Sequence, residues 1–507
     1  MSTRRDGRAT IKPFLIFLLT AARLAAAPSA VSFSQDKTSL PACGFVEVGI
    51  RVSAPDARNP FTDVSVEAVF SLRGAPALPV DGFCDSADGS VYRGRFMPTK
   101  PGEYEYTIRF RQGDFDKRHA GVFHATDDRR RGILRVDPNY PWHFLWEGTS
   151  EHYFWNGTTA FLMTGRQDDA VIRGIIDRLH RLKVNRIRSM LAARTTSFWG
   201  EPVTATPEFR PCLNPWVSPS GQPDCMLPAV DYTRFNVTYW QKVERMVQHA
   251  WSKDMIVGLI FGWNDSKVHP ATGSEDELRY FRYAVARLSA FSNVNWEMGD
   301  DITAYRDHKW ARLVGTSLQK WDVYRHLISN HPNSDREPLD RQGEWMGFAS
   351  FQSWRRPQHE RMLAQRRKQE QIGRIVPQVN QEYGYEDHYP RFSSFGYPDL
   401  QNADANRREA WGIAMAGAYQ TTGETAKRGT GVWPDTGGGW INGRGDDSMV
   451  MLNGMSHMVD FFTSFEWWKP EPHDELVDTW AYCLAEPGRR YVVYLRTGRP
   501  VDVRLGG

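Results

Sequence analysis

Between about residue 133 and residue 465, short apolar segments alternate with amphipathic segments of helix length. This alternation is typical of parallel strands, each followed by a helix. Eight such units in this length match a closed barrel of eight parallel strands surrounded by helices. An open doubly wound sheet is the competing architecture, but its usual G-x-G-x-x-G turn is absent after every candidate strand. We therefore expect an α/β fold whose main part, residues 133–465, is a (β/α)8 barrel of the TIM type.

The expected elements can be placed along the chain. The strands are expected at Ala160–Thr164, Val184–Met190, Met255–Gly262, Val294–Gly299, His326–Ser329, Gly347–Ser353, Ile375–Glu382 and Gly417–Gly423. The helices are expected at Asp169–Leu182, Tyr239–Lys253, Glu275–Phe291, Lys309–Tyr324, Glu360–Gln371 and Asn406–Met415. Barrels of this kind carry their chemistry at the C-terminal ends of the strands, so these ends are the places to look for functional residues.

Two β-rich regions are expected to flank the barrel. Residues 31–128 hold short alternating runs between turn residues and no helical period, which predicts an antiparallel β-sandwich. The charged segment Asp127-Asp-Arg-Arg-Arg-Gly132 then looks like a solvated linker. After the barrel, the runs Tyr491–Leu495 and Val501–Leu505 predict a short C-terminal β-rich segment over residues 466–507.

The first 30 residues are typical of an export signal. Arg4, Arg5, Arg8 and Lys12 precede an apolar run, and the small residues of 25–30 offer a cleavage site. We therefore expect a secreted protein, extracellular or periplasmic, that has no membrane segment once the signal is removed.

An exported protein can form disulfides, and this chain has five cysteines. Cys212 and Cys225 lie in one loop rich in Pro and Gly, which suits a local disulfide. Cys43 and Cys84 could pair within the N-terminal region, which leaves Cys483 over. Free buried thiols are the alternative for each of them. No Cys/His spacing resembles a zinc site, and no metal is expected.

Two of the expected strands end in carboxylates. The fourth runs into Asn295-Trp-Glu-Met-Gly-Asp-Asp301 and the seventh into Val379-Asn-Gln-Glu382. Hydrolysis of a glycosidic bond needs two carboxyl groups beside the scissile bond, one protonated to help the leaving group and one ionised. Because strand ends of a barrel meet at one face, Glu382 is expected to work with a carboxyl of the fourth strand.

Polar and aromatic residues at neighbouring strand ends are candidate substrate contacts. Arg188, late in the second strand, is expected to orient Glu382 and to keep its pKa low. The remaining candidates are Trp263, Asn264, Glu297, Asp300, His331, Trp354, Tyr385 and Trp440. Each alone is more typical of packing, but together they describe a cleft lined for a sugar. The 19 Trp residues fit such a role, because flat aromatic faces stack on sugar rings, although they also fit a large core.

These motifs resemble those of retaining barrel glycosidases of clan A, and in particular apiosidase-like barrels. The segments Gln381-Glu382-Tyr383-Gly384-Tyr385-Glu386 and Gly438-Gly-Trp-Ile-Asn-Gly-Arg-Gly-Asp446 carry the resemblance in the barrel. The N-terminal region, with Asn59-Pro-Phe-Thr-Asp63, is similar to the sandwich that often precedes such barrels. The tail around Tyr482-Cys-Leu-Ala-Glu-Pro-Gly488 resembles the start of a β-domain described as collagen-binding.

The resemblance implies a retaining glycoside hydrolase that needs neither a metal nor an organic cofactor. Glu382 would be the nucleophile, and the second carboxyl of the family's Asn-Glu pair corresponds to Asp301. Asp301 is shorter by one methylene group than the glutamate it replaces. Either the backbone compensates, or Glu297 serves as acid/base instead, or normal activity is lost. Glu297 has a further interpretation, as a structural residue bonded to an arginine inside the barrel.

Three functions therefore stay open. The first is hydrolysis of a polysaccharide or oligosaccharide. The second is non-catalytic binding of a carbohydrate or matrix component on a degenerate barrel, and the third is a lyase or transglycosylase reaction at the same site. A net charge of +3 is too small to indicate a nucleic-acid partner. Neither the sugar nor the oligomeric state follows from the sequence.

Overall fold

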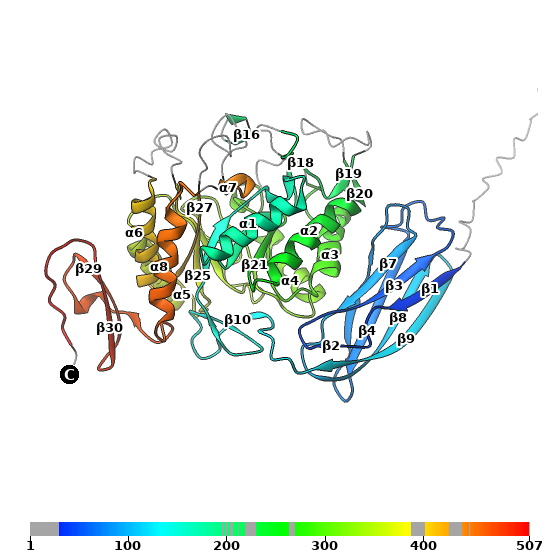
Figure 1. Cartoon of the computed structure of the whole chain (residues 1–507), viewed down its shortest axis with the longest axis horizontal. Coiled ribbons are helices and arrows are strands. Elements are labelled where there is room, and N and C mark those ends of the chain that lie inside the picture. Colours follow the sequence, from blue (N-terminus) through cyan, green and yellow to red (C-terminus); the bar gives the residue numbers. More distant parts are fainter. Residues whose placement is uncertain are drawn as a thin grey trace, which may run out of the picture.

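The protein consists of a β-sandwich, a barrel and a short β-sheet, which follow one another along its long axis (Figure 1). This computed structural model describes residues 30–194, 197–198, 201–202, 206–210, 212–218, 230–262, 269–386, 401–424, 439–445 and 447–505. The expected export signal and the candidates Trp263 and Asn264 lie outside these residues. Among the helices described, none combines the length and the apolar character needed to cross a membrane.

The barrel is built from eight parallel strands, as predicted. They are β13 (Asn156–Thr159), β14 (Arg186–Met190), β21 (Ile256–Ile260), β22 (Val294–Glu297), β23 (Ile328–Ser329), β24 (Ala349–Gln352), β25 (Gln378–Glu382) and β27 (Tyr419–Glu424). Their order in the sheet is β23-β22-β21-β14-β13-β27-β25-β24, so the first and the last of the eight strands pair. Between β23 and β24 a parallel bridge joins Ile328 and Met346, which nearly closes the barrel.

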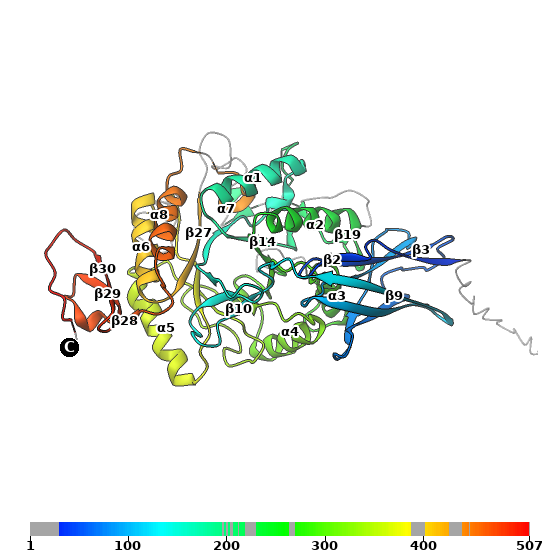
Figure 2. The same ribbon diagram turned by 60° about the horizontal axis from the view of Figure 1, so that its bottom comes forward.

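Helices surround these strands (Figure 2). The long ones are α1 (Asp169–Arg181), α2 (Val237–Trp251), α3 (Glu275–Leu288), α4 (His308–Trp321), α5 (Gln358–Ile372), α6 (Ala403–Met415) and α8 (Met451–Thr463). In α1 the side chain of Asp168 caps the helix by accepting from the N–H of Ala170, and Ile172, Ile175 and Leu179 recur on the buried face. Apolar spacing of this kind recurs in α2, α3 and α4, and six of these helices were predicted to within a few residues.

The first barrel strand was predicted at the wrong place. Ala160–Thr164 leads into a short 3-10 helix, and the strand is the preceding segment Asn156–Thr159. This strand is polar, so its sequence gives no apolar run to recognise. Its polar groups are satisfied inside the barrel, where Asn156 donates to the carbonyl of Lys183 and accepts from Gln420.

The N-terminal region is the predicted antiparallel sandwich of two sheets. One sheet contains β1 (Val31–Gln35), β3 (Val46–Val52), β7 (Val91–Phe96) and β6 (Phe83–Cys84). The other contains β2 (Ser39–Pro41), β9 (Phe115–Thr126), β8 (Gly102–Gln112), β4 (Val64–Leu72) and β5 (Leu78–Asp81). Buried and more exposed residues alternate along β3, so each of its apolar side chains faces the other sheet.

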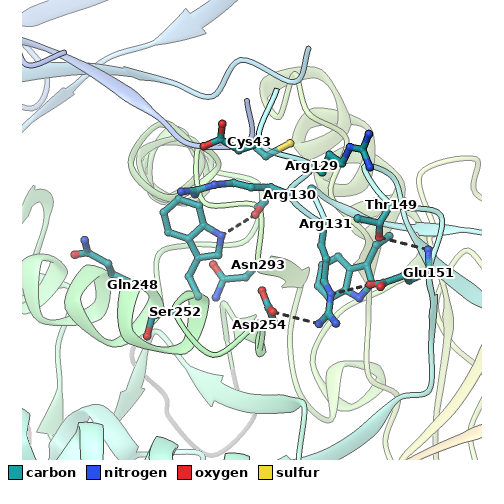
Figure 3. Close-up of a pocket in the computed structure, with 15 residues that line it drawn as sticks. Cys43, Arg129, Arg130, Arg131, Thr149, Glu151, Gln248, Ser252, Asp254 and Asn293 are labelled. Carbon is teal, nitrogen blue, oxygen red and sulfur yellow. Dashed lines mark hydrogen bonds and ion pairs between the residues drawn. The ribbon is translucent and has the colours of Figure 1, made fainter. Parts of the chain in front are cut away.

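The linker is anchored to the barrel. Arg129, Arg130 and Arg131 are exposed and have no regular secondary structure, as expected. However, Nε of Arg131 lies 2.9 Å from Oε2 of Glu151, and its Nη1 lies 3.2 Å from Asp254. These pairs border a cavity of about 630 Å³ between the sandwich and the barrel (Figure 3). They hold the connection in a defined path, which a purely solvated linker would not have.

The tail forms a small three-stranded sheet of β28 (Glu471–Pro472), β29 (Ala481–Glu486) and β30 (Arg490–Leu495). The second predicted strand, Val501–Leu505, is wrong, because these residues have no regular secondary structure. Val501 and Val503 instead cover the apolar face of the sheet around Cys483. Burial of these side chains therefore explains the apolar pattern that suggested a strand.

The predicted pairing of Cys43 with Cys84 is also wrong, since both are free buried thiols, as is Cys483. Cys84 lies opposite Tyr92, whereas the N–H of Cys43 donates to the carbonyl of Pro98. Tyr92 and Pro98 are six residues apart in extended chain, which puts the two cysteines roughly 20 Å apart along the strand. This distance is far more than a disulfide spans. The predicted Cys212–Cys225 disulfide cannot be compared, because Cys225 and the side chain of Cys212 lie outside the described residues.

A buried ionic cluster joins the sandwich to α2 and α3. Arg287 of α3 is fully buried and pairs with Asp85 of the sandwich, and its Nε lies 2.8 Å from Glu244 of α2. From the sandwich, Nη1 of Arg95 lies 2.9 Å from the same Glu244. Because Arg95 and Arg287 both pair with Glu244, one connected network of charges holds the sandwich against the barrel.

We predict that Arg287→Ala lowers the free energy of unfolding by about 3–5 kcal/mol, because it removes the most deeply buried cation of the cluster and leaves Asp85 with Arg93 alone and Glu244 with Arg95 alone. Urea unfolding followed by fluorescence measures the change. Arg245→Ala, which removes a half-exposed arginine paired with Asp169, is the control and should change stability by less than about 1 kcal/mol. Equal effects of the two substitutions would contradict a stabilising role for the cluster.

Candidate active site

Two arginines of β14 point into the barrel. Side chains alternate along a strand, so Arg186 and Arg188 share the inner face. Both are completely buried. A buried guanidinium is very unfavourable without anionic partners, so the surrounding strands must supply carboxylates.

Glu297, the last residue of β22, binds both arginines. It pairs with Arg186, its Oε2 lies 2.8 Å from Nε of Arg188, and the same oxygen accepts from Gln381 at 3.2 Å. Burial alone would raise the pKa of Glu297, but the two guanidinium groups outweigh it and lower that pKa. Glu297 is therefore a carboxylate whose ionised form the two arginines favour, which agrees with one of the interpretations given above, a structural residue bonded to an arginine.

Asp300 is the second carboxylate held by Arg188. It pairs with a terminal nitrogen of that side chain, and its Oδ1 lies 2.5 Å from Nδ1 of the buried His331. Burial opposes ionisation of Asp300, but the charges of Arg188 and His331 prevail and lower its pKa to about 2. Asp300 is therefore ionised at any pH at which the protein would work.

Asp301 occupies a turn that the backbone of His331 holds from both sides. The N–H of His331 donates to the carbonyl of Gly299, and its carbonyl accepts from Ile302. Asp301 itself has a left-handed backbone with a φ of 50°, which is uncommon outside glycine. This turn breaks the alternation of the strand, and Asp301 is half-buried whereas Asp300 is buried.

Glu382 reaches the site through an irregularity in β25. Phe351 pairs with Asn380 and Gln352 pairs with Glu382, so Gln381 is an extra residue in the register, as in a β-bulge. Asn380 points outward to Gln358 of α5, at 2.9 Å, and the residues after it turn back towards the barrel.

The carboxyl of Glu382 meets Arg188, but at a longer distance than the other carboxylates do. Oε2 lies 3.8 Å from Nη1 of Arg188, and Tyr385 and Gln352 hydrogen-bond the same carboxyl. Burial, together with the negative charge of Asp300, raises the pKa of Glu382 to about 8 against the opposing effect of Arg188. Arg188 does act to lower this pKa, as expected, but burial and the charge of Asp300 outweigh it, so the expectation of a low pKa for Glu382 is wrong.

The aromatic candidates of three strand ends come together beside Glu382. Trp440 stacks on Tyr385 with ring centroids 4.5 Å apart, and Trp354 meets Tyr385 edge to face at 5.2 Å. All three are buried. The structure thus joins Arg188, Glu297, Asp300, His331, Glu382 and these aromatic residues in one region at the C-terminal ends of the strands.

Some polar residues of the site were not predicted. Arg186 lies two residues before Arg188, and strand alternation would have placed both on the inner face. Gln352 ends β24 and Gln381 lies in the bulge, where it also donates to Ser350 at 2.8 Å. No pattern in the sequence marks a bulge, so the role of Gln381 was not accessible without the structure.

Asp300, Asp301 and His331 also offer three potential metal ligands, with donor atoms within 4.8 Å of one another. However, Oδ1 of Asp300 already pairs with Arg188 and lies against His331. A cation there would have to compete with a guanidinium that is held in place by Glu297 as well. The arrangement fits an ion-pair network better than a divalent cation site.

The fold and the site together define a class of protein. Its members are barrels of eight parallel strands in which buried carboxylates gather at the C-terminal ends of the strands. The comparison with known families is more specific. The apiosidase-like catalytic domain family matches residues 142–497, and the chain belongs to this family. Residues 42–111 match a domain of unknown function, DUF5060. The family match continues through the tail sheet, and none of the comparisons supports the resemblance to a collagen-binding domain.

Solved structures share the fold. A candidate glycoside hydrolase from Bacteroides vulgatus is similar with a TM-score of 0.70 and 19% identity, over 89% of this chain and 84% of that one. A family 5 glycoside hydrolase from the same organism has a TM-score of 0.54 and 18% identity, over 74% and 82% of the two chains. No curated protein matches the sequence significantly.

We predict that Arg188→Met lowers the free energy of unfolding by about 3–5 kcal/mol at pH 7, since it leaves buried carboxylates uncompensated. The pKa of Asp300 is lowered in the folded state, so its ionised form stabilises the protein above its ordinary pKa of 3.8 and stops doing so as the pH falls towards 2. The variant lacks this contribution. The difference between variant and wild type should therefore be largest at neutral pH and shrink below about pH 4.

Urea unfolding at pH 7 and pH 3.5 measures this difference. Arg181→Met, at an exposed position of α1, serves as the control and should be nearly neutral at both values. A stability loss for Arg188→Met that does not depend on pH would contradict the electrostatic account.

Proposed function

We propose that the protein is a glycoside hydrolase that cleaves O-glycosidic bonds of a polysaccharide or other glycan by a retaining double displacement. The observation that carries this proposal is the grouping of Glu382 with carboxylates of the β22 end around Arg188. Family membership supports it independently. A retaining mechanism needs one carboxylate to attack the anomeric carbon and a second carboxyl to protonate the leaving oxygen and then activate water.

We assign the nucleophile to Glu382 and the acid/base to Asp301. Glu297 and Asp300 are both bonded to Arg188 and have lowered pKa values, so neither is suited to donate a proton. Asp301 is the remaining carboxyl at this strand end, and it is more exposed than the other two. Asp300 and His331 would then position the turn that carries Asp301, and Trp354, Tyr385 and Trp440 would lie near the sugar.

We predict that Glu382→Gln and Asp301→Asn each reduce the release of reducing sugar by at least about 10³-fold while the protein stays folded. A panel of soluble plant and microbial polysaccharides, assayed for reducing ends, provides the test. Glu370→Gln, an exposed position on α5, is the matched control and should keep full activity.

The outcomes separate the open interpretations. If Glu297→Gln removes activity without unfolding the protein and Asp301→Asn does not, the acid/base assignment is wrong. If the wild type binds a polysaccharide and releases no sugar from any of them, the non-catalytic function is favoured. An unsaturated product or a transferred glycosyl unit would instead favour the lyase or transglycosylase reaction.

The pH dependence tests the role of Glu382. As a nucleophile Glu382 must be ionised, and its pKa is raised to about 8, so kcat/KM should increase with pH between about 6 and 8. If Glu382 were instead the acid, kcat/KM would decrease over the same range, because its protonated form would be needed. Initial rates at low substrate concentration across pH 5–10 distinguish the two, and the position of the change should move in Asp300→Asn, which removes the neighbouring charge.

A further inference from the structure

A second cleft lies at the opposite end of the barrel from the carboxylates. Its volume is about 710 Å³, and it is lined by His152 of β12 (His152–Tyr153) and the two residues before it, by residues 463–468 at the end of α8 and after it, and by Arg490 of β30. His152 precedes β13 by a few residues, and α8 ends where the cleft begins. Because the strands start here, this is the base of the barrel, whereas the candidate active site lies where they end.

The centre of this cleft is an aromatic platform. The imidazole of His152 is stacked on Trp468, with ring centroids 3.7 Å apart and planes 6° from parallel. His152 is itself held by Asp137, whose Oδ2 lies 2.6 Å from its Nε2. One face of the Trp468 indole is therefore covered by a ring that a buried carboxylate fixes in place.

The other face of Trp468 is not covered by its aromatic neighbour Trp467. The centroids of these two rings are 4.9 Å apart with planes at 87°, and Trp467 lies 6.2 Å from His152. The centroids of His152, Trp468 and Trp467 therefore form a nearly right-angled triangle, and the right angle is at Trp468 because His152 lies 3.7 Å above that ring. Trp467 thus lies beside the edge of the Trp468 ring, and Trp468 itself is only half-buried.

Charged groups of both signs surround the platform. Glu151 lines the cleft and is fixed by Arg131 of the linker (Figure 3). Glu466 lies 2.5 Å from Lys469, and Nη2 of Arg490 lies 3.9 Å from Glu466. Nη1 of Arg490 is buried and has no hydrogen-bond partner among the described residues. Since Glu151 and Glu466 are each already paired with a cation, the cleft favours an uncharged ligand rich in hydroxyl groups.

We propose that this cleft is a binding site for a neutral glycan chain, separate from the candidate active site. A pyranose ring would place its apolar C–H face on the exposed part of the Trp468 ring, and its hydroxyl groups would meet Glu151, Glu466 and Arg490. Such binding needs no bond cleavage and does not depend on the proposed hydrolytic function. It would hold a polymer on the base of the barrel, away from the strand ends.

Affinity electrophoresis tests this site. Native gels containing hydroxyethylcellulose, galactomannan, arabinoxylan or polygalacturonate are run with the full chain carrying Glu382→Gln, so that no polymer is degraded. We expect at least one neutral polymer to retard this protein. Adding Trp468→Ala should weaken that retardation about 5–10-fold, which is the size of effect expected for an aromatic stacking contact. Trp321→Ala, which removes another half-buried tryptophan on α4, is the matched control and should leave retardation unchanged.

A smaller change guards against misfolding. Trp468→Phe keeps a ring against His152 and should weaken binding less than Trp468→Ala does, with an unfolding midpoint close to that of the parent. Unchanged retardation in Trp468→Ala, retardation by polygalacturonate alone, or no retardation by any neutral polymer would each overturn the proposal. Retardation that depends on Trp468 in a protein without hydrolytic activity would support it, even though the proposed function would then fail.

Discussion

The buried guanidinium of Arg188 is the interaction on which the candidate site depends. It comes from β14 and meets Glu297 and Asp300 from the β22 region and Glu382 from β25. None of these groups is stable as a lone charge inside the barrel, so each requires the others to be in place. The relative positions of three strands are thereby coupled to one side chain, and a shift of any strand would leave a charge without its partner.

The same arginine makes the carboxylates unequal. Asp300 and Glu297 are bonded to it closely and are ionised, whereas Glu382 lies 3.8 Å away and also faces the charge of Asp300. As a result, the pKa of Asp300 is lowered to about 2 and that of Glu382 is raised to about 8. Burial opposes ionisation of both carboxyl groups, and only the one that pairs closely with Arg188 overcomes it.

The fold was largely predictable from the sequence, because most strands and helices carry apolar residues at their own period. The polar first strand, Asn156–Thr159, was the exception, since its stability comes from buried hydrogen bonds. In the site, the buried Glu297 bonded to arginine agrees with one of the two interpretations that its position on the fourth strand allowed. The burial of Asp300 rather than Asp301 did not follow from the alternation of side chains along the strand, because the left-handed turn at Asp301 ends that geometry.

The two ends of the barrel are stabilised by different means, and this bears on where function can reside. At the strand ends, buried charges fix the geometry, so a substitution there disturbs both stability and chemistry. At the base, aromatic packing and the Arg131–Glu151 pair connect the barrel to the linker. Trp468 belongs to this second region, and in the described part of the chain its ring contacts are with His152 and Trp467 rather than with the network around Arg188. A ligand bound on Trp468 would leave the electrostatics around Arg188 unchanged, so binding at the base and chemistry at the strand ends are physically separable.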